Sequence, residues 1–174
     1  MSELREYQIP FVGMKLGVHH FNFELEESFF SHFESSLVKE SKIFVDLEFD
    51  KKDRLFVLNF DISGSIMTDC DRCGQQFDLP IHGNYILYVK HGDKREEDAD
   101  NEDVIWIPDN ESMVELSETI YEFVHLSLPI KKTHPDLPNG DMGCDQEILK
   151  LLGIMDENQN KDPRWDILNN LNTN

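Results

Sequence analysis

Three cysteines and one histidine are the residues of this chain best suited to hold a metal ion. Cys70 and Cys73 form a Cys-x-x-Cys pair, and His134 precedes Cys144 by ten residues; the chain has no other cysteine. Thiolates and imidazole are ligands that structural zinc prefers, and such a pair completed by a distant Cys and His is a common zinc pattern. Four protein ligands would close the coordination shell, as in structural rather than catalytic sites. The spacing therefore predicts a structural zinc that ties the middle of the chain to its C-terminal third.

Two other uses of these thiols stay open at this point. Cysteine is often an inert buried residue, and a Cys-x-x-Cys pair can also be a redox pair. Asp69, Asp71 and Arg72 surround the pair, so we expect the thiols in a polar turn and not in an apolar core. Redox chemistry needs a lowered thiol pKa, whereas the two aspartates are expected to raise it and only Arg72 to lower it. Zinc is the interpretation that these residues favour.

Alternating apolar residues predict the strands that position the Cys-x-x-Cys pair. Over several segments one face is apolar and the other polar, a pattern typical of an antiparallel sheet with one solvated side. The segments are 12–25, 43–49, 56–66 and 77–89. Cys70 and Cys73 lie between the last two segments, so we expect them at the tip of a hairpin. Gly74 is expected to make this tight turn possible, because glycine has few steric restrictions.

Helical spacing of apolar residues predicts helices that accompany this sheet. We expect one over about 28–38, one from Ser117 as N-cap until Pro129 ends it, and a shorter one from near Cys144 to Gly153. A short strand is predicted at 104–107. The predicted fold class is α+β: a mostly antiparallel sheet, with a curl towards a barrel as one option, and a few helices packed on one face.

The predicted domain organisation is one α+β domain over 1–155, followed by a linker and a C-terminal Asp-Pro-Arg-Trp segment over 156–174. A chain of 174 residues can bury a core of its own. Within the domain, 91–103 is an acidic stretch that we expect to form a mobile loop. Trp165 and Arg164 either pack on the domain or contact a partner, and we favour the partner because a polar linker separates them from the preceding helix.

The charge of the chain limits its partners. A net charge of −19 disfavours direct binding of RNA, since that affinity comes from clustered Lys and Arg on phosphates. It favours a basic partner, such as a ribosomal protein, although acidic surfaces also simply maintain solubility. No apolar run approaches the roughly 20 residues of a membrane span, no secretory signal is visible, and the cysteine number is odd, so we expect a cytoplasmic protein.

The motifs occur in an order that resembles the YceD family, the large ribosomal RNA subunit accumulation proteins of bacteria and plastids. The resemblance covers about Ser63 to the C-terminus. The motifs are Cys-Asp-Arg-Cys (70–73), an acidic loop, Val-Glu-Leu-Ser-Glu-Thr-Ile-Tyr-Glu-Phe (114–123), Leu-Ser-Leu-Pro-Ile-Lys-Lys-Thr-His (126–134), Cys144 and Asp-Pro-Arg-Trp (162–165). The spacing from His134 to Cys144 is longer than the family pattern, so His134 is the ligand that the resemblance supports least.

The resemblance implies a cytoplasmic, non-enzymatic factor needed for normal levels of large-subunit ribosomal RNA. From the acidic charge we expect that factor to act with a basic ribosomal protein or an rRNA-processing factor. The resemblance marks the four metal-ligand candidates, Pro129, the segment 163–165 and Arg72. Arg72 either contacts a phosphate or a partner carboxylate, or pairs with its aspartate neighbours. Two alternatives remain open: a thiol- or zinc-dependent enzyme, and a protein-binding module unrelated to ribosomes with a structural metal site.

Overall fold

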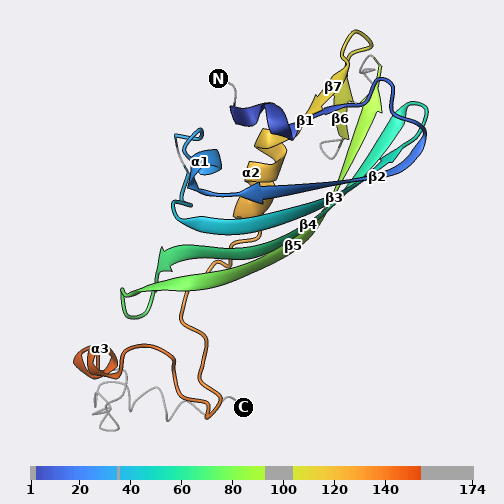
Figure 1. The fold of residues 1–174 in the computed structure, drawn as a ribbon. Coiled ribbons are helices and arrows are strands. Elements are labelled where there is room, and N and C mark those ends of the chain that lie inside the picture. Colours follow the sequence, from blue (N-terminus) through green and yellow to red (C-terminus); the bar gives the residue numbers. More distant parts are fainter. Residues whose placement is uncertain (1–2, 35, 93–103, 154–174) are drawn as a thin grey trace, which may run out of the picture.

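The computed structural model describes residues 3–34, 36–92 and 104–153 (Figure 1). A five-stranded sheet with the order β2-β3-β4-β5-β6 forms its centre. The strands are β2 (Gly17–Leu25), β3 (Ser41–Lys51), β4 (Leu55–Asp69), β5 (Gln76–His91) and β6 (Val104–Ile107). The first four are antiparallel neighbours and β6 runs parallel to β5, which confirms the α+β class and the mostly antiparallel sheet. The barrel option is wrong, because β2 and β6 form two separate edges.

Period-two alternation separates the two faces of the sheet as the sequence predicts. In β3, Val45, Leu47 and Phe49 are buried while their neighbours face outwards. In β4, Phe60 and the residues two positions apart on either side are buried in the same way. We call the face that carries these buried residues the inner face. It holds most of the apolar area that stabilises the fold.

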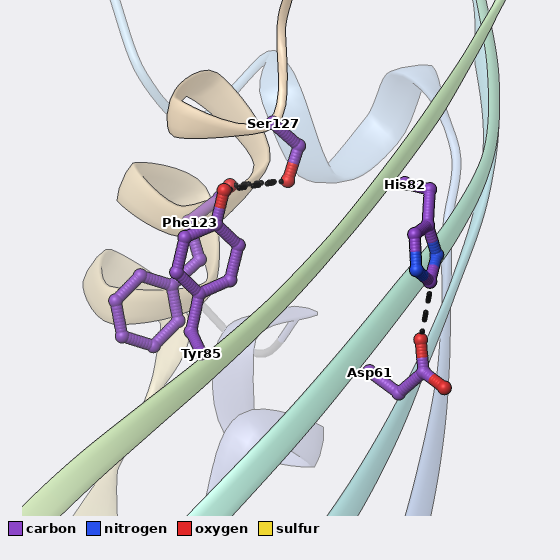
Figure 2. Close-up of polar contacts among 5 residues, drawn as sticks. All are labelled: Asp61, His82, Tyr85, Phe123 and Ser127. Atoms are coloured by element: carbon purple, nitrogen blue, oxygen red, sulfur yellow. Dashed lines mark hydrogen bonds and ion pairs between the residues drawn. The ribbon is translucent and has the colours of Figure 1, made fainter.

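Two helices and a small second sheet cover the inner face (Figure 1). The helices are α1 (Glu27–Phe30) and α2 (Ser117–Leu126), and the small sheet pairs β1 (Gln8–Pro10) with β7 (Met113–Glu115), preceded by the 3-10 helix η1 (Glu3–Tyr7). Phe123 of α2 stacks on Tyr85 of β5 with ring centroids 4.5 Å apart, and its ring meets Phe60 edge-on at 5.2 Å. The hydroxyls of Tyr85 and Ser127 are 3.0 Å apart (Figure 2).

Three local expectations differ from the structure. The helix predicted over 28–38 is wrong in extent, because α1 ends at Phe30 and the chain turns there. Phe33, which continues the helical spacing in the sequence, instead stacks on Tyr121 from the turn after α1, with ring centroids 4.1 Å apart. The strand predicted within 12–25 begins at Gly17, and Ser117 is the first residue of α2 and not its N-cap, which is Leu116.

Some expectations concern residues outside the described part of the chain. Residues 93–103 of the predicted acidic loop lie there, as does the whole segment 156–174 with Arg164 and Trp165. The predicted domain boundary at 155 therefore stays a prediction. Among the described helices, none is long and apolar enough to cross a membrane.

Candidate metal centre

The four predicted ligands meet beyond the tip of the β4–β5 hairpin. Their ligand atoms, one each from Cys70, Cys73, His134 and Cys144, all lie within 4.8 Å of one another. Sγ of Cys70 is 3.8 Å from Sγ of Cys144, and Sγ of Cys73 is 3.6 Å from Nδ1 of His134. Residues separated by more than 60 positions along the chain thus point their donor atoms at one small volume.

These distances fit a tetrahedral zinc. With Zn–S bonds of about 2.3 Å and Zn–N bonds of about 2.0–2.1 Å, tetrahedral angles place two sulfurs about 3.8 Å apart and a sulfur and a nitrogen about 3.6 Å apart. Both observed separations agree with these values. Three thiolates and one imidazole are also the soft donor set that zinc accepts. The residues present therefore fit the metal in donor type and number, and the Cys70–Cys144 and Cys73–His134 separations fit its spacing.

The turn between β4 and β5 sets the two cysteines of the pair side by side. The N–H of Cys70 donates to the carbonyl of Gln75 (2.9 Å), and the N–H of Gly74 donates to the carbonyl of Cys70 (2.8 Å). Gly74 has a φ of +72°, a conformation that glycine adopts without steric cost. The predicted role of Gly74 in this turn is confirmed.

A second segment carries His134 to the hairpin tip and is fastened there by Asp71. The N–H of Asp71 donates to the carbonyl of Lys132 (2.7 Å), and the N–H of Lys132 donates to the Asp71 carboxylate (2.7 Å). The ring of Phe77 in β5 lies against the His134 ring, with centroids 4.4 Å apart. Sequence reasoning missed both contacts, because only the folded chain brings these segments together.

The long spacing between His134 and Cys144 is absorbed by a closed loop. Inside the loop the N–H of Leu137 donates to the carbonyl of Asp141 (2.8 Å). Its two ends touch, since a Cβ added to Gly143 would lie 2.1 Å from the carbonyl oxygen of Pro135. The extra residues bulge outwards, and His134 and Cys144 still meet at the site.

The helix α3 (Gln146–Leu151) begins directly after the last ligand. Asp145 caps it, because its carboxylate accepts from the N–H groups of Glu147 (2.8 Å) and Ile148 (3.3 Å). These hydrogen bonds lower the pKa of Asp145. The side chain of Gln75, next to the hairpin turn, also donates to this carboxylate (3.1 Å). Asp145 was missed as a site residue, although an Asp directly before a predicted helix is an N-cap signal.

The thiols are buried, which corrects the expectation that they lie in a polar turn outside any core. Cys70 is 2% exposed, and Cys73 and Cys144 are also buried, whereas Asp69 and Asp71 beside them are exposed. The chain turns the charged neighbours outwards and the sulfurs inwards. A buried set of converging sulfurs is compatible with a closed metal shell.

The expectation that the flanking aspartates raise the pKa of the thiols is not met at Cys70. Burial raises its pKa, but hydrogen bonds from the backbone N–H groups of Cys73, Arg72 and His134 outweigh burial and lower the pKa to about 6. Burial raises the pKa of Cys144 to about 11, and the neighbouring Cys70 and Cys73 act in the same direction. The same backbone donors would stabilise a thiolate that ligates a metal.

Arg72 points into the site. Its guanidinium donates to Sγ of Cys144, with an N–S distance of 3.7 Å. A cation beside a sulfur favours its thiolate form, but burial and the two neighbouring cysteines still leave the pKa of Cys144 raised. The predicted partner contacts of Arg72, Arg164 and Trp165 stay predictions.

One protein family matches this chain, over residues 58–172: the large ribosomal RNA subunit accumulation protein YceD. The match covers well over half of the chain. The chain belongs to the YceD family. The YceD match confirms the resemblance seen in the motifs. It begins in β4 and includes all four candidate ligands, whereas β1, β2 and β3 precede it. Searches of curated proteins and of solved structures gave no match.

Proposed function

We propose that this protein is a non-enzymatic ribosome-biogenesis factor that supports the accumulation or processing of large-subunit ribosomal RNA. The YceD match over residues 58–172 carries this proposal, because that family is described as a large ribosomal RNA subunit accumulation protein. The site of action is the cytoplasm, where bacterial ribosomes assemble. No reaction is needed for such a role.

The mechanism that we propose runs through protein partners. A net charge of −19 repels RNA phosphates and attracts basic proteins, so the partner is a basic ribosomal protein or an rRNA-processing factor. Arg72, Arg164 and Trp165 are the proposed contact residues, since arginine and tryptophan are enriched at binding hot spots.

In this proposal Cys70, Cys73, His134 and Cys144 hold a structural zinc. The 3.8 Å and 3.6 Å donor separations support this role. Such an ion would join the β4–β5 hairpin to the segment that leads into α3. The surface presented to a partner would then keep one shape.

The test compares large-subunit with small-subunit ribosomal RNA, including precursors, on one gel from cells depleted of this protein. We expect a selective loss of large-subunit RNA that the wild-type chain restores. Complementation with Cys73→Ser would show whether the metal site is needed. Unchanged RNA ratios after complete depletion would refute the role.

One observation favours a second function, thiol chemistry at Cys70. The pKa of this thiol is lowered to about 6, as in reactive cysteines, although its 2% exposure is lower than reactive thiols usually have. Reaction of the purified, metal-analysed protein with iodoacetamide separates the two roles. Rapid alkylation of Cys70 in protein carrying one zinc per chain would favour thiol chemistry, whereas alkylation only after chelation supports a structural site.

A further inference from the structure

The face of the sheet opposite the inner face, called the outer face here, carries none of the described helices (Figure 1). In Figure 2, Tyr85 and Phe123 lie on the α2 side of the strands, and Asp61 and His82 lie on the other side. The outer face is hollowed across β2, β3, β4 and β5, with a volume of about 690 Å³. A surface hollow of this size is large enough to receive several side chains.

Strand register arranges the outward side chains of this hollow, all polar except Ile86, in two rows that cross four strands. One row is Asn22, Asp46, Asp61 and Asn84. The next row is His20, Glu48, Asn59 and Ile86. All eight residues line the hollow. Carboxylates thus occupy the centre of the hollow, and amides lie mostly beside them.

Asp46 and Asp61 face one another directly across β3 and β4, and both are exposed. Like charges directly opposite one another destabilise a sheet. Asn22 donates to Asp46, and His82 lies 3.6 Å from Asp61, so each carboxylate has a polar neighbour and still faces the other across the two strands. A charge arrangement that works against local stability is typical of a surface kept for binding.

Apolar side chains border the acidic centre. Ile86 is 56% exposed and Val18 52%, and Phe44 and Tyr88 are also exposed on this face. The lysines of the face lie outside the two rows: Lys42 is over Phe44 at 5.7 Å, and Lys90 is over Trp106 at 4.9 Å. The hollow therefore offers anionic oxygens at its centre and apolar or aromatic surface at its margins.

We propose that this outer hollow docks an extended protein segment that carries arginine side chains. The proposal rests on the proposed function in one respect, because it adds an acidic surface for the basic partner to the proposed contacts of Arg72, Arg164 and Trp165. Guanidinium groups pair with carboxylates in a bidentate manner, and their planar heads and aliphatic stems suit aromatic and apolar margins. Four strands spaced by about 4.8 Å span roughly 14 Å, which is the length of about four extended residues. RNA is the disfavoured occupant, since its phosphates would meet Asp46, Glu48 and Asp61.

The experiment measures binding of a fluorescein-labelled ten-residue peptide that alternates arginine with alanine, by anisotropy at physiological salt, to the full chain. Asp46→Asn together with Asp61→Asn should weaken binding at least tenfold. The matched control, Glu118→Gln with Asp136→Asn, removes the same charge from exposed positions off this face and should change binding less than twofold. Backbone amide shifts on titration should be confined to β2, β3, β4 and β5.

If both double variants weaken peptide binding equally, binding depends on the overall charge of the protein and the proposal is overturned. Amide shift changes outside β2, β3, β4 and β5 would also overturn it. Tighter binding of a ribosomal RNA fragment than of the peptide at the same face would also overturn it. Thermal unfolding checks that weaker binding does not come from a loss of folding. Removing the two opposed charges should leave Asp46→Asn with Asp61→Asn at least as stable as wild type.

The same variant separates this proposal from the proposed function. If depletion leaves the RNA ratio unchanged, the biogenesis role fails while the peptide result stands. If depletion lowers large-subunit RNA and Asp46→Asn with Asp61→Asn restores it fully, the role stands and the hollow is not its docking surface.

Discussion

The sheet core and the candidate metal site are held together in different ways. On the inner face, large apolar side chains such as Phe49, Phe56 and Phe60 are almost completely buried, so many nonspecific contacts share the stabilisation. Beyond the hairpin tip, α3 lies away from α1 and α2 (Figure 1), and the segments meet through the four candidate donor atoms, a few hydrogen bonds and a small buried set that includes Leu149. The first region depends on buried area, whereas the second depends on individual atoms.

This comparison predicts that substitutions in the two regions act on different quantities. A change in the core should alter the free energy of unfolding of the whole sheet. A change at the hairpin tip should alter metal affinity and the local order of 132–151, with little effect on the sheet.

The largest effect is expected from Phe60→Ala. Phe60 is 2% exposed and meets Phe123 edge-on, so truncation leaves a cavity between β4 and α2. We expect a loss of about 3–5 kcal/mol in the free energy of unfolding, measured by urea denaturation with far-UV circular dichroism. Val18→Ala, at a 52% exposed site on the outer face, is the control and should cost less than about 0.5 kcal/mol. Equal losses in the two variants would contradict a core confined to the inner face.

Cys144→Ser is the corresponding change at the metal site. It removes one of the four candidate donors, so we expect zinc affinity to fall by more than about 100-fold. This loss is larger than the roughly 10- to 100-fold loss expected when a residue that only contacts a ligand is replaced. Bound zinc is measured by mass spectrometry and affinity by competition with a chelator. Hydrogen exchange should speed up around the hairpin tip and 132–151 while the centres of β3 and β4 stay protected. Excess chelator on the wild-type chain should reproduce this pattern, and global unfolding in either case would remove the distinction between the regions.

Gly143→Ala tests the neck of the loop between His134 and Cys144. The new Cβ would lie 2.1 Å from the Pro135 carbonyl oxygen, so the two ends of the loop must separate and displace the ligands. We expect zinc affinity to drop by about 10- to 100-fold, with sheet stability unchanged. Leu137→Ala, at a 46% exposed position of the same loop, should bind zinc like wild type. Normal zinc affinity in Gly143→Ala would show that the neck does not position the ligands.

The smallest effect is expected from Asp145→Ala. The substitution removes the N-cap of α3 and the acceptor for Gln75, which should lower the local stability of this helix. Amide exchange in α3 should therefore accelerate roughly fivefold, measured by NMR. Asp145→Asn keeps a capping oxygen and should exchange nearly as slowly as wild type. Identical exchange in all three proteins would mean that the ligands alone order α3.

The strands of the sheet were predictable, and most of the local corrections concern short elements. Residues 43–49, 56–66 and 77–89 alternate over enough positions for the period to be unambiguous. The helix over 28–38 was wrong because aromatic residues at helical spacing also pack onto α2 from a turn. The pairing of β1 with β7 was not predicted, since three residues carry too little periodicity to be recognised.

The candidate ligands were also predictable, but their environment was not. Residue type and spacing single out Cys70, Cys73, His134 and Cys144, and the structure places their donor atoms together. The lowered pKa of Cys70 was not expected, because it arises from backbone N–H groups that converge only in the fold. Charges on neighbouring side chains are visible in a sequence, whereas the direction of a backbone dipole is not.

The alternating strands, the donor set of the candidate metal site and membership of the YceD family can all be recognised without a structure, because each depends on residue type and on separation along one chain. Tertiary structure decided which segments meet: Asp71 with Lys132, Pro135 with Gly143, and Asp46 with Asp61. These contacts depend on strand register and on how the loops close, which are set by the packing of the whole domain and not by local pattern.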